Sequence, residues 1–260
     1  MKEPFSSGSP LVYFFGHASP AENVPLFQML VAILAAKVNE RLSKDVDAKS
    51  SGVIVNTCGI FEGLGHDVIA SIIRLLAIDI VLVMGSDKVY SSLTSNLPHE
   101  TAIIVTLPRS GGVVNRDAKT RSKARKSRIG NYFYGRNNLA PERKALKLSA
   151  VELFQAGRVQ LTEGMKFIGD RPDDKTALFR VTPSIDLAHR VLAVIHPSSE
   201  NLDVSSYNEE LPQELLRGNV AGFVYVIEVN IEKDQIIVLT PCPGELPSKY
   251  LFKGGIQWYE

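Results

Sequence analysis

The sequence predicts an α/β protein: a mostly parallel sheet with flanking helices, followed by a smaller all-β domain at the C-terminal end. In the first half, short apolar runs typical of strands buried on both faces alternate with segments of helical spacing. After about residue 149 no long helical pattern occurs, and short alternating runs separated by turn residues follow. The 260 residues are enough for one large domain or two small ones.

The first half predicts four strands and four helices. The apolar runs that predict strands are residues 11–15, 52–59, 78–84 and 101–107. Helical spacing predicts helices over residues 22–43, 67–76 and 88–96, and a basic helix follows the turn Gly111-Gly112. Ligands of parallel sheets bind beyond the carboxyl ends of the strands. Small and polar residues gather at these ends, at residues 16–17, 56–59, 85–87 and 108–110.

The second half predicts a compact antiparallel sandwich or barrel. Its strand-like runs are residues 147–154, 178–181, 191–195, 223–229 and 235–240. We place the domain boundary at the polar joint that begins with Arg136, which gives domains of residues 1–136 and 137–260.

Composition is that of an ordinary globular protein, with 45% hydrophobic and 22% charged residues. The net charge of +1 hides a basic excess over residues 109–147 and an acidic segment over residues 200–214. This asymmetry favours one anion-binding patch over a generally basic coat. The two cysteines and five scattered histidines show neither a disulfide framework nor a metal-ligand spacing, so we expect no metal site and a reducing compartment. We expect no secretory signal and no membrane association, because the longest apolar run, residues 29–36, is short.

The stretch of residues 115–128, NRDAKTRSKARKSR, is the most informative part of the sequence. It holds seven Lys or Arg and a single acid, Asp117. In a helix, Arg121, Arg125 and Arg128 share one face at i, i+4 and i+7. Like charges so placed repel, whereas guanidinium groups bind phosphate oxygens in a bidentate manner. A phosphate-binding row, a solvated basic surface and a nuclear localisation patch all fit this stretch.

No motif supplies a nucleotide cradle. Neither G-x-x-x-x-G-K-[ST] nor G-x-G-x-x-G occurs in the sequence. The turn Asn56-Thr57-Cys58-Gly59, followed by Gly63 and Gly65, fits either an anion site or a tight connection that needs glycine.

Seven segments in one order resemble the Clp-type polynucleotide 5′-hydroxyl kinase family, a subunit of the pre-mRNA cleavage and polyadenylation machinery. They are PLVYFFG, GVIVNTCG, LPRSGGVV, the Arg-rich helix with NYFYG, VTPS, NVAGFVYV and VLTPCPGELP. The resemblance implies an incomplete P-loop kinase-type sheet here, with the Walker A loop and the magnesium-binding strand upstream of these residues.

The resemblance also implies roles for particular residues. The Arg-rich helix corresponds to the family's lid, whose phosphate-contacting residues would be Arg116, Arg121, Arg125 and Arg128. The family's substrate clasp falls on Asn56, Thr57, Gly59 and Ile60. Ile60 stands where the family has a tryptophan, and an isoleucine cannot stack on a base, an interaction of about 1–3 kcal/mol.

The implied activity of the intact family is ATP- and Mg²⁺-dependent phosphorylation of RNA 5′-hydroxyl ends, tRNA exon ends among them, in the nucleus. We expect this chain alone to be inactive. The implied partners are RNA 5′ ends and subunits of the cleavage and polyadenylation complex. The alternatives are a non-catalytic scaffold subunit of that complex and an unrelated small-molecule α/β binder.

Overall fold

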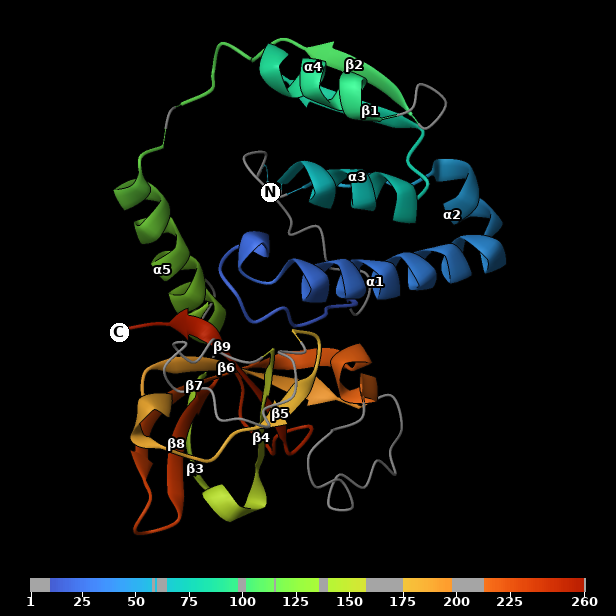
Figure 1. Cartoon of the computed structure of the whole chain (residues 1–260). Helices are drawn as coiled ribbons and strands as arrows, with labels where there is room; N and C mark the ends of the chain where they lie inside the picture. Colours follow the sequence, from blue (N-terminus) through green and yellow to red (C-terminus); the bar gives the residue numbers. More distant parts are fainter. Residues whose placement is uncertain are drawn as a thin grey trace, which may run out of the picture. The chain divides into compact units, whose positions relative to one another are not determined.

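The computed structural model describes residues 10–57, 59, 65–97, 102–114, 116–135, 140–157, 175–197 and 213–259. The chain forms two compact units (Figure 1). Unit 1 contains residues Met1–Ala18 and Asp117–Glu260, and unit 2 contains residues Ser19–Arg116. The predicted fold class, a parallel α/β region followed by a β-rich region, is confirmed.

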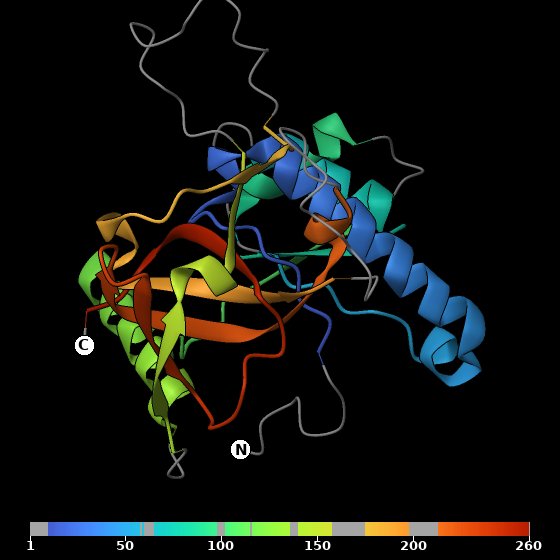
Figure 2. The same cartoon turned by 90° about the horizontal axis from the view of Figure 1, so that it is seen from below.

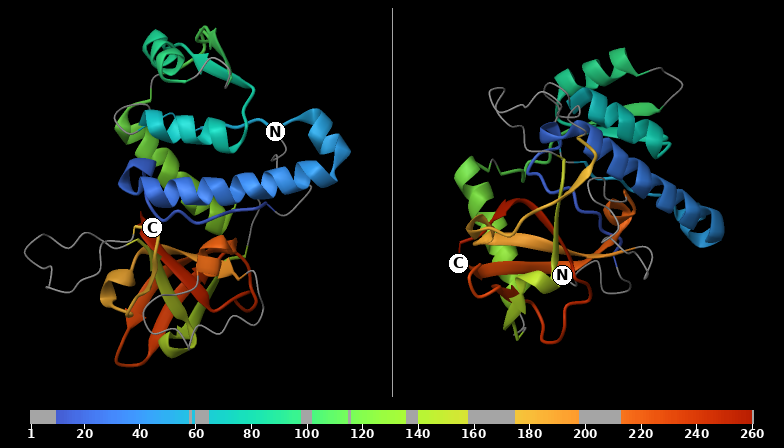
Figure 3. Two further views of the ribbon diagram at one scale, coloured as in Figure 1. Left: turned by 45° about the vertical axis from the view of Figure 1, so that its right-hand side comes forward. Right: turned by 60° about the horizontal axis from the view of Figure 1, so that its bottom comes forward.

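Unit 2 is built from helices and a small parallel sheet. After the short 3-10 helix η1 (Pro20–Glu22), α1 (Val24–Lys44) begins where the Asn23 side chain accepts a hydrogen bond from the Leu26 N–H. The shorter α2 (Val46–Ser51) follows, and α3 (Gly65–Leu75) lies alongside α1 (Figure 3). These helices match the predicted ones at residues 22–43 and 67–76, whereas α2 was not predicted.

The parallel sheet of unit 2 pairs β1 (Ile80–Met84) with β2 (Ile103–Leu107). Between them, α4 (Asp87–Asn96) covers one face, where Ile69, Ile73, Val83 and Leu93 form a core. The other face carries side chains that are largely exposed: Ile80, Leu82, Met84, Ile103 and Val105. Burial on one face only is characteristic of a sheet packed against a single helical layer.

Two of the four predicted strands of this sheet are wrong. Residues 52–57 form no strand, and Ile54 is 99% exposed. Residues 11–15 also form no strand, and they belong to unit 1. An apolar run becomes a strand only where a neighbouring strand continues the ladder of hydrogen bonds. Val12 bonds only to Asn219 and Val220 at the start of β7, and no ladder forms along residues 11–15.

Unit 1 contains a seven-stranded sheet in the order β3-β8-β7-β6-β9-β4-β5. Figure 1 labels these strands, and Figure 2 shows them from below. All neighbouring pairs are antiparallel except β4 and β9, which run parallel. The strands are β3 (Glu142–Lys147), β4 (Glu152–Ala156), β5 (Leu178–Arg180), β6 (Arg190–His196), β7 (Asn219–Asn230), β8 (Gln235–Thr240) and β9 (Tyr250–Gln257). The short 3-10 helices are η2 (Leu148–Ala150), η4 (Ile185–Leu187) and η5 (Gln213–Arg217).

Most strands of unit 1 lie where the alternating runs predict them. The run at residues 147–154 is an exception, because η2 turns the chain between β3 and β4 within it. Strands β3 and β9 were not predicted. The acidic segment is mostly outside the described residues.

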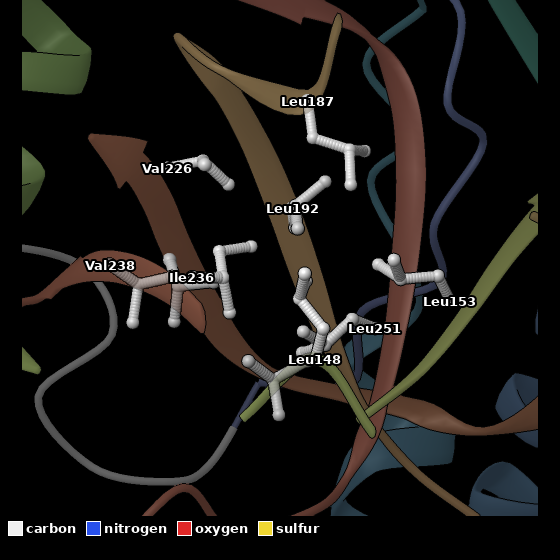
Figure 4. Packing of buried hydrophobic residues seen from close by; sticks show 10 residues of the cluster. Leu148, Leu153, Leu187, Leu192, Val226, Ile236, Val238 and Leu251 are labelled. Atoms are coloured by element: carbon white, nitrogen blue, oxygen red, sulfur yellow. The ribbon is translucent and has the colours of Figure 1, made fainter. Parts of the chain in front are cut away.

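The core of unit 1 is a cluster of aliphatic side chains from five strands and two 3-10 helices (Figure 4). Five of its side chains are fully buried, with 0% exposure: Leu192, Val226, Ile236, Val238 and Leu251. Leu148, Leu153 and Leu187 pack against them. Burial of such side chains contributes about 1.5–3 kcal/mol each, before the cost of ordering the chain. This core makes unit 1 a stable platform for the elements packed on its outside.

The basic helix, α5 (Ala118–Tyr134), belongs to unit 1. The predicted boundary at residues 136/137 remains a prediction, and residues 136–139 lie outside the described residues. The compact units divide the chain earlier, after Arg116, because the last turns of α5 pack on the sheet (Figures 1 and 2).

Candidate functional site

The basic helix α5 has well-defined ends. Asp117 is its N-cap: the carboxylate accepts a hydrogen bond of 2.7 Å from the Thr120 N–H. Hydrogen bonds from the Thr120 side chain and backbone hold the pKa of Asp117 below its ordinary value. The helix ends at Gly135, whose φ of 66° is a conformation that glycine adopts without strain. The predicted helix thus forms with its cap supplied by the one acid of the basic stretch.

The first three turns of α5 carry the cationic residues. Arg121, Arg125 and Arg128 are all exposed, and their spacing places them along one side of the helix. Lys119, Lys123 and Lys126 are exposed as well, and the helix itself contains no acid. The positive end of the helix dipole lies at the N-terminal end of α5, where it adds to the repulsion among these cationic side chains. An anion relieves both effects, so this half of α5 is suited to bind phosphate groups.

The fourth predicted lid residue, Arg116, precedes the N-cap and is exposed. It is the last residue of unit 2, whereas the other three arginines belong to unit 1. The structure therefore brings Arg121, Arg125 and Arg128 together on one helix.

The last turns of α5 are anchored on the sheet. Phe133 is 0% exposed and stacks on Trp258, with ring centroids 5.8 Å apart. The Tyr132 hydroxyl accepts a hydrogen bond of 2.9 Å from the Phe223 N–H, and burial raises the pKa of Tyr132. These aromatic contacts fix one end of α5, while its basic half carries no buried side chain. Trp258 is itself buried, with 5% exposure.

The carboxyl ends of β1 and β2 lie side by side, as expected for parallel strands. The Gly85 N–H donates to the Leu107 carbonyl oxygen at 2.9 Å. Gly85 has φ of 60°, and a Cβ there would lie 2.2 Å from Arg109 Cγ. The Arg109 side chain thus crosses over Gly85 at this edge. Sequence reasoning had placed Arg109 at the strand end but had not assigned it to the site.

The predicted clasp residues are only partly described. Asn56 and Thr57 are exposed and lie in an irregular segment after α2 rather than at the end of a strand. Gly59 has φ of 69°, which explains the glycine by backbone conformation. Ile60 lies outside the described residues. Asn56, Thr57 and Gly59 belong to unit 2, whereas the arginine row belongs to unit 1.

The described residues hold no group of three or more His, Cys, Asp or Glu side chains that could bind a metal ion. The sequence also has no phosphate loop with its lysine. The arginines of α5 fit phosphate oxygens, which guanidinium groups bind in a bidentate manner. Within the described part of the chain, no helix combines the length and apolar character needed to cross a membrane.

Two family models match consecutive parts of the chain. The model of the mRNA cleavage and polyadenylation factor CLP1 P-loop matches residues 1–135, and that of the pre-mRNA cleavage complex II protein Clp1 matches residues 139–260. The chain belongs to the CLP1 family. The resemblance found in the sequence motifs is confirmed.

Curated relatives support the same assignment. A protein CLP1 homolog of Aedes aegypti is 35% identical over 260 residues, covering 99% of this chain and 59% of its own length. The polyribonucleotide 5′-hydroxyl-kinase Clp1 of Rattus norvegicus is 32% identical over 253 residues, covering 96% of this chain and 57% of its own length. The CLP1-family chain thus spans less than three fifths of the curated relatives it matches.

Solved structures show the same fold. A complex of wild-type Clp1p with Pcf11p matches with a TM-score of 0.74 at 22% identity, over 97% of this chain and 56% of that one. A second structure, of an extended interface between Pcf11p and Clp1p and of ATP loss in a point mutant, matches with a TM-score of 0.73 at 24% identity. It covers 98% of this chain and 59% of that one.

Proposed function

We propose that α5 of this CLP1-family chain is the phosphate-contacting lid of a polynucleotide 5′-hydroxyl kinase fold. The observation that carries the proposal is the exposed row Arg121, Arg125 and Arg128 on a helix that is anchored only at its other end. In the whole protein, these guanidinium groups would neutralise the equatorial oxygens of a phosphoryl group during its transfer to an RNA 5′-hydroxyl. A lid arginine of this kind contributes roughly 10³–10⁵ in rate.

The roles of the remaining site residues are part of the same proposal. Arg116, next to the N-cap, would add a fourth cation toward the phosphate. Asn56, Thr57, Gly59 and position 60 would face the RNA end, with weaker clamping because Ile60 offers no indole to stack on a base. ATP and Mg²⁺ would be the cofactors of the intact kinase, and this sequence holds no G-x-x-x-x-G-K-[ST] loop to bind them. A nuclear location and a domain division at residues 136/137 complete the proposal.

Salt-dependent RNA binding tests the arginine row. We expect the chain to bind 5′-phosphorylated single-stranded RNA in a fluorescence anisotropy assay, with an affinity that falls as salt rises. The double variant Arg121→Gln, Arg125→Gln should lower the slope of log affinity against log salt by roughly 1.4, at about 0.7 per phosphate contact.

The matched control removes the same charge elsewhere on unit 1. Arg217 and Lys233 are exposed and lie outside α5, so Arg217→Gln, Lys233→Gln should leave the slope close to that of the wild type. Equal effects of the two double variants would mean that only net charge matters, and the lid proposal would be wrong.

We also expect no phosphoryl transfer by this chain alone. The assay is radiolabel transfer from ATP to a 5′-hydroxyl oligoribonucleotide, with a full-length CLP1-family kinase as the positive control. Turnover by the purified chain would refute this expectation.

The second candidate function is a non-catalytic scaffold subunit of the pre-mRNA cleavage and polyadenylation complex. The isoleucine at position 60 favours it, because RNA clamping matters only to a kinase. The two solved structures described above concern Clp1p together with Pcf11p. Pulldown of purified cleavage-factor subunits by this chain, without RNA binding, would support the scaffold over the lid.

A further inference from the structure

Phe223 of β7 lies where two distant segments of unit 1 meet. The chain passes between the two units after Ala18 and again after Arg116. The segment of unit 1 before the first crossing is residues 10–18, here called the N-terminal strap. The segment of unit 1 after the second crossing is α5. The Phe223 ring contacts both, at centroid distances of 6.5 Å to Phe14 of the strap and 5.8 Å to Tyr132 of α5.

The backbone of the same stretch of β7 binds both segments. Strand β8 pairs with β7 only from Tyr225 onward, so residues 219–224 have no partner in β8. The Val220 N–H donates to the Val12 carbonyl oxygen at 2.9 Å, and the Phe223 N–H donates to the Tyr132 hydroxyl at 2.9 Å. The strap and α5 thus complete hydrogen bonds that a neighbouring strand would otherwise make.

The strand is shaped locally to admit these contacts. The register between β6 and β7 shifts between Val194 and Ile195, opposite residues 220–222. A Cβ at Gly222 would lie 3.1 Å from the Tyr132 hydroxyl oxygen, closer than an ordinary contact. On the strap side, the Asn219 side chain accepts a hydrogen bond of 2.8 Å from the Val12 N–H.

We propose that Phe223 and Tyr132 form a positioning joint that holds α5 and the N-terminal strap to one stretch of β7. The basic half of α5 carries no buried side chain, so its orientation depends on this anchored end. The evidence for the joint is the set of contacts given above. Its expected effect on phosphate binding rests, in addition, on the proposed lid function. Phe223 and Tyr132 act through the arginines and touch no substrate themselves.

Hydrogen exchange on the full chain tests the joint. Phe223→Ala removes both ring contacts, so amide exchange should rise roughly three- to tenfold in peptides covering residues 10–18 and 118–135. Phe223→Leu should give a smaller rise in both. The control Tyr259→Ala removes an exposed ring of the same unit that contacts His189, and it should change neither peptide. Exchange that is unchanged, or raised in only one segment, would overturn the joint.

Tyr132→Phe keeps the ring and removes only the hydroxyl, so it serves if Phe223→Ala does not fold. It should raise exchange in residues 118–135 and leave residues 10–18 unchanged, and no rise in α5 would overturn the joint.

RNA affinity separates the joint from the lid function. Phe223→Ala should weaken binding of 5′-phosphorylated RNA at least threefold with a less steep salt dependence, although every cation is retained. Unchanged RNA binding beside raised exchange would remove the link between the joint and phosphate binding. A wild-type chain that does not bind RNA would refute the lid proposal, and exchange alone would then decide the joint.

Discussion

Phe133 connects the basic helix to the sheet through a single fully buried side chain. It packs against Trp258 and Tyr225, with centroid distances of 5.8 Å and 6.3 Å. Truncating a buried Phe to Ala removes its burial and leaves a cavity, a loss of about 3–5 kcal/mol in the free energy of unfolding. We therefore expect Phe133→Ala to lower the free energy of unfolding of unit 1 by that amount, measured by urea denaturation followed by circular dichroism.

Phe133→Leu is the matched control, because it keeps most of the apolar volume. Its loss should be less than half that of Phe133→Ala. A Phe133→Ala variant as stable as the wild type would show that α5 is not fixed by this contact.

Asp186 links η4 to β9 and makes part of the stability of unit 1 dependent on pH. Its carboxylate lies 2.6 Å from Lys253 Nζ and also accepts from the Ser184 hydroxyl. The hydrogen bond from Lys253, with smaller contributions from Ser184 and Arg190, holds the pKa of Asp186 below its ordinary value. A carboxyl with a lowered folded pKa stabilises the protein above its unfolded pKa, and this stability is lost as pH falls through the folded pKa.

We therefore expect thermal unfolding of the wild type to shift to lower temperature below about pH 4. Asp186→Asn should be less stable than the wild type at pH 7 and should lose less on acidification. Parallel melting-temperature curves for the two proteins between pH 7 and pH 3 would contradict this role.

At the scale of elements, the N-cap of α5 should decide how much of the basic half is helical. The first three turns bury no side chain, so the hydrogen bond from the Thr120 N–H to Asp117 is an important local support for them. Asp117→Ala should raise amide exchange in residues 118–125 severalfold. Asp117→Asn keeps a capping oxygen and should raise it less. Equal exchange in the wild type and both variants would show that the cap contributes nothing.

Local pattern predicts the helices well and the strands unevenly. The periodic apolar residues of α1 and α3 and the cap of α5 lie within each helix, so the sequence contains the information needed. Residues 11–15 read as a buried strand, but their partners are Asn219 and Val220, far along the chain. The strand β9 was missed because Gly254 and Gly255 interrupt its pattern, and the structure requires Gly254 where a Cβ would lie 2.7 Å from the Gly16 carbonyl oxygen.

The candidate site, too, has a part that the sequence predicts and a part that it does not. The row Arg121, Arg125 and Arg128 follows from helical spacing alone. The anchoring of α5 could not be predicted, because the hydrogen bond between Tyr132 and Phe223 joins residues 91 positions apart. Only the aromatic cluster at the end of the basic helix offered a signal for it.

At the scale of the whole molecule, the two units differ in how completely they bury their sheets. Unit 1 has a core with many side chains at 0% exposure, whereas the two-stranded sheet of unit 2 leaves Ile80, Leu82, Met84 and Ile103 at least 56% exposed. A two-stranded sheet with one open apolar face is marginally stable in water. We therefore expect unit 2 to unfold first and unit 1 to remain.

Limited proteolysis with mass spectrometry checks this difference. Cleavage should begin within residues 19–116 and continue into the basic half of α5, which is exposed and rich in Lys and Arg. The resistant fragment should begin near Ile129, where α5 first packs on the sheet, rather than after the predicted boundary at residues 136/137. Urea denaturation should show two transitions, because a unit with few buried contacts opens at lower denaturant than one with a complete core. A single cooperative transition of the whole chain would mean that unit 2 draws its stability from unit 1, and the expected order of unfolding would then be wrong.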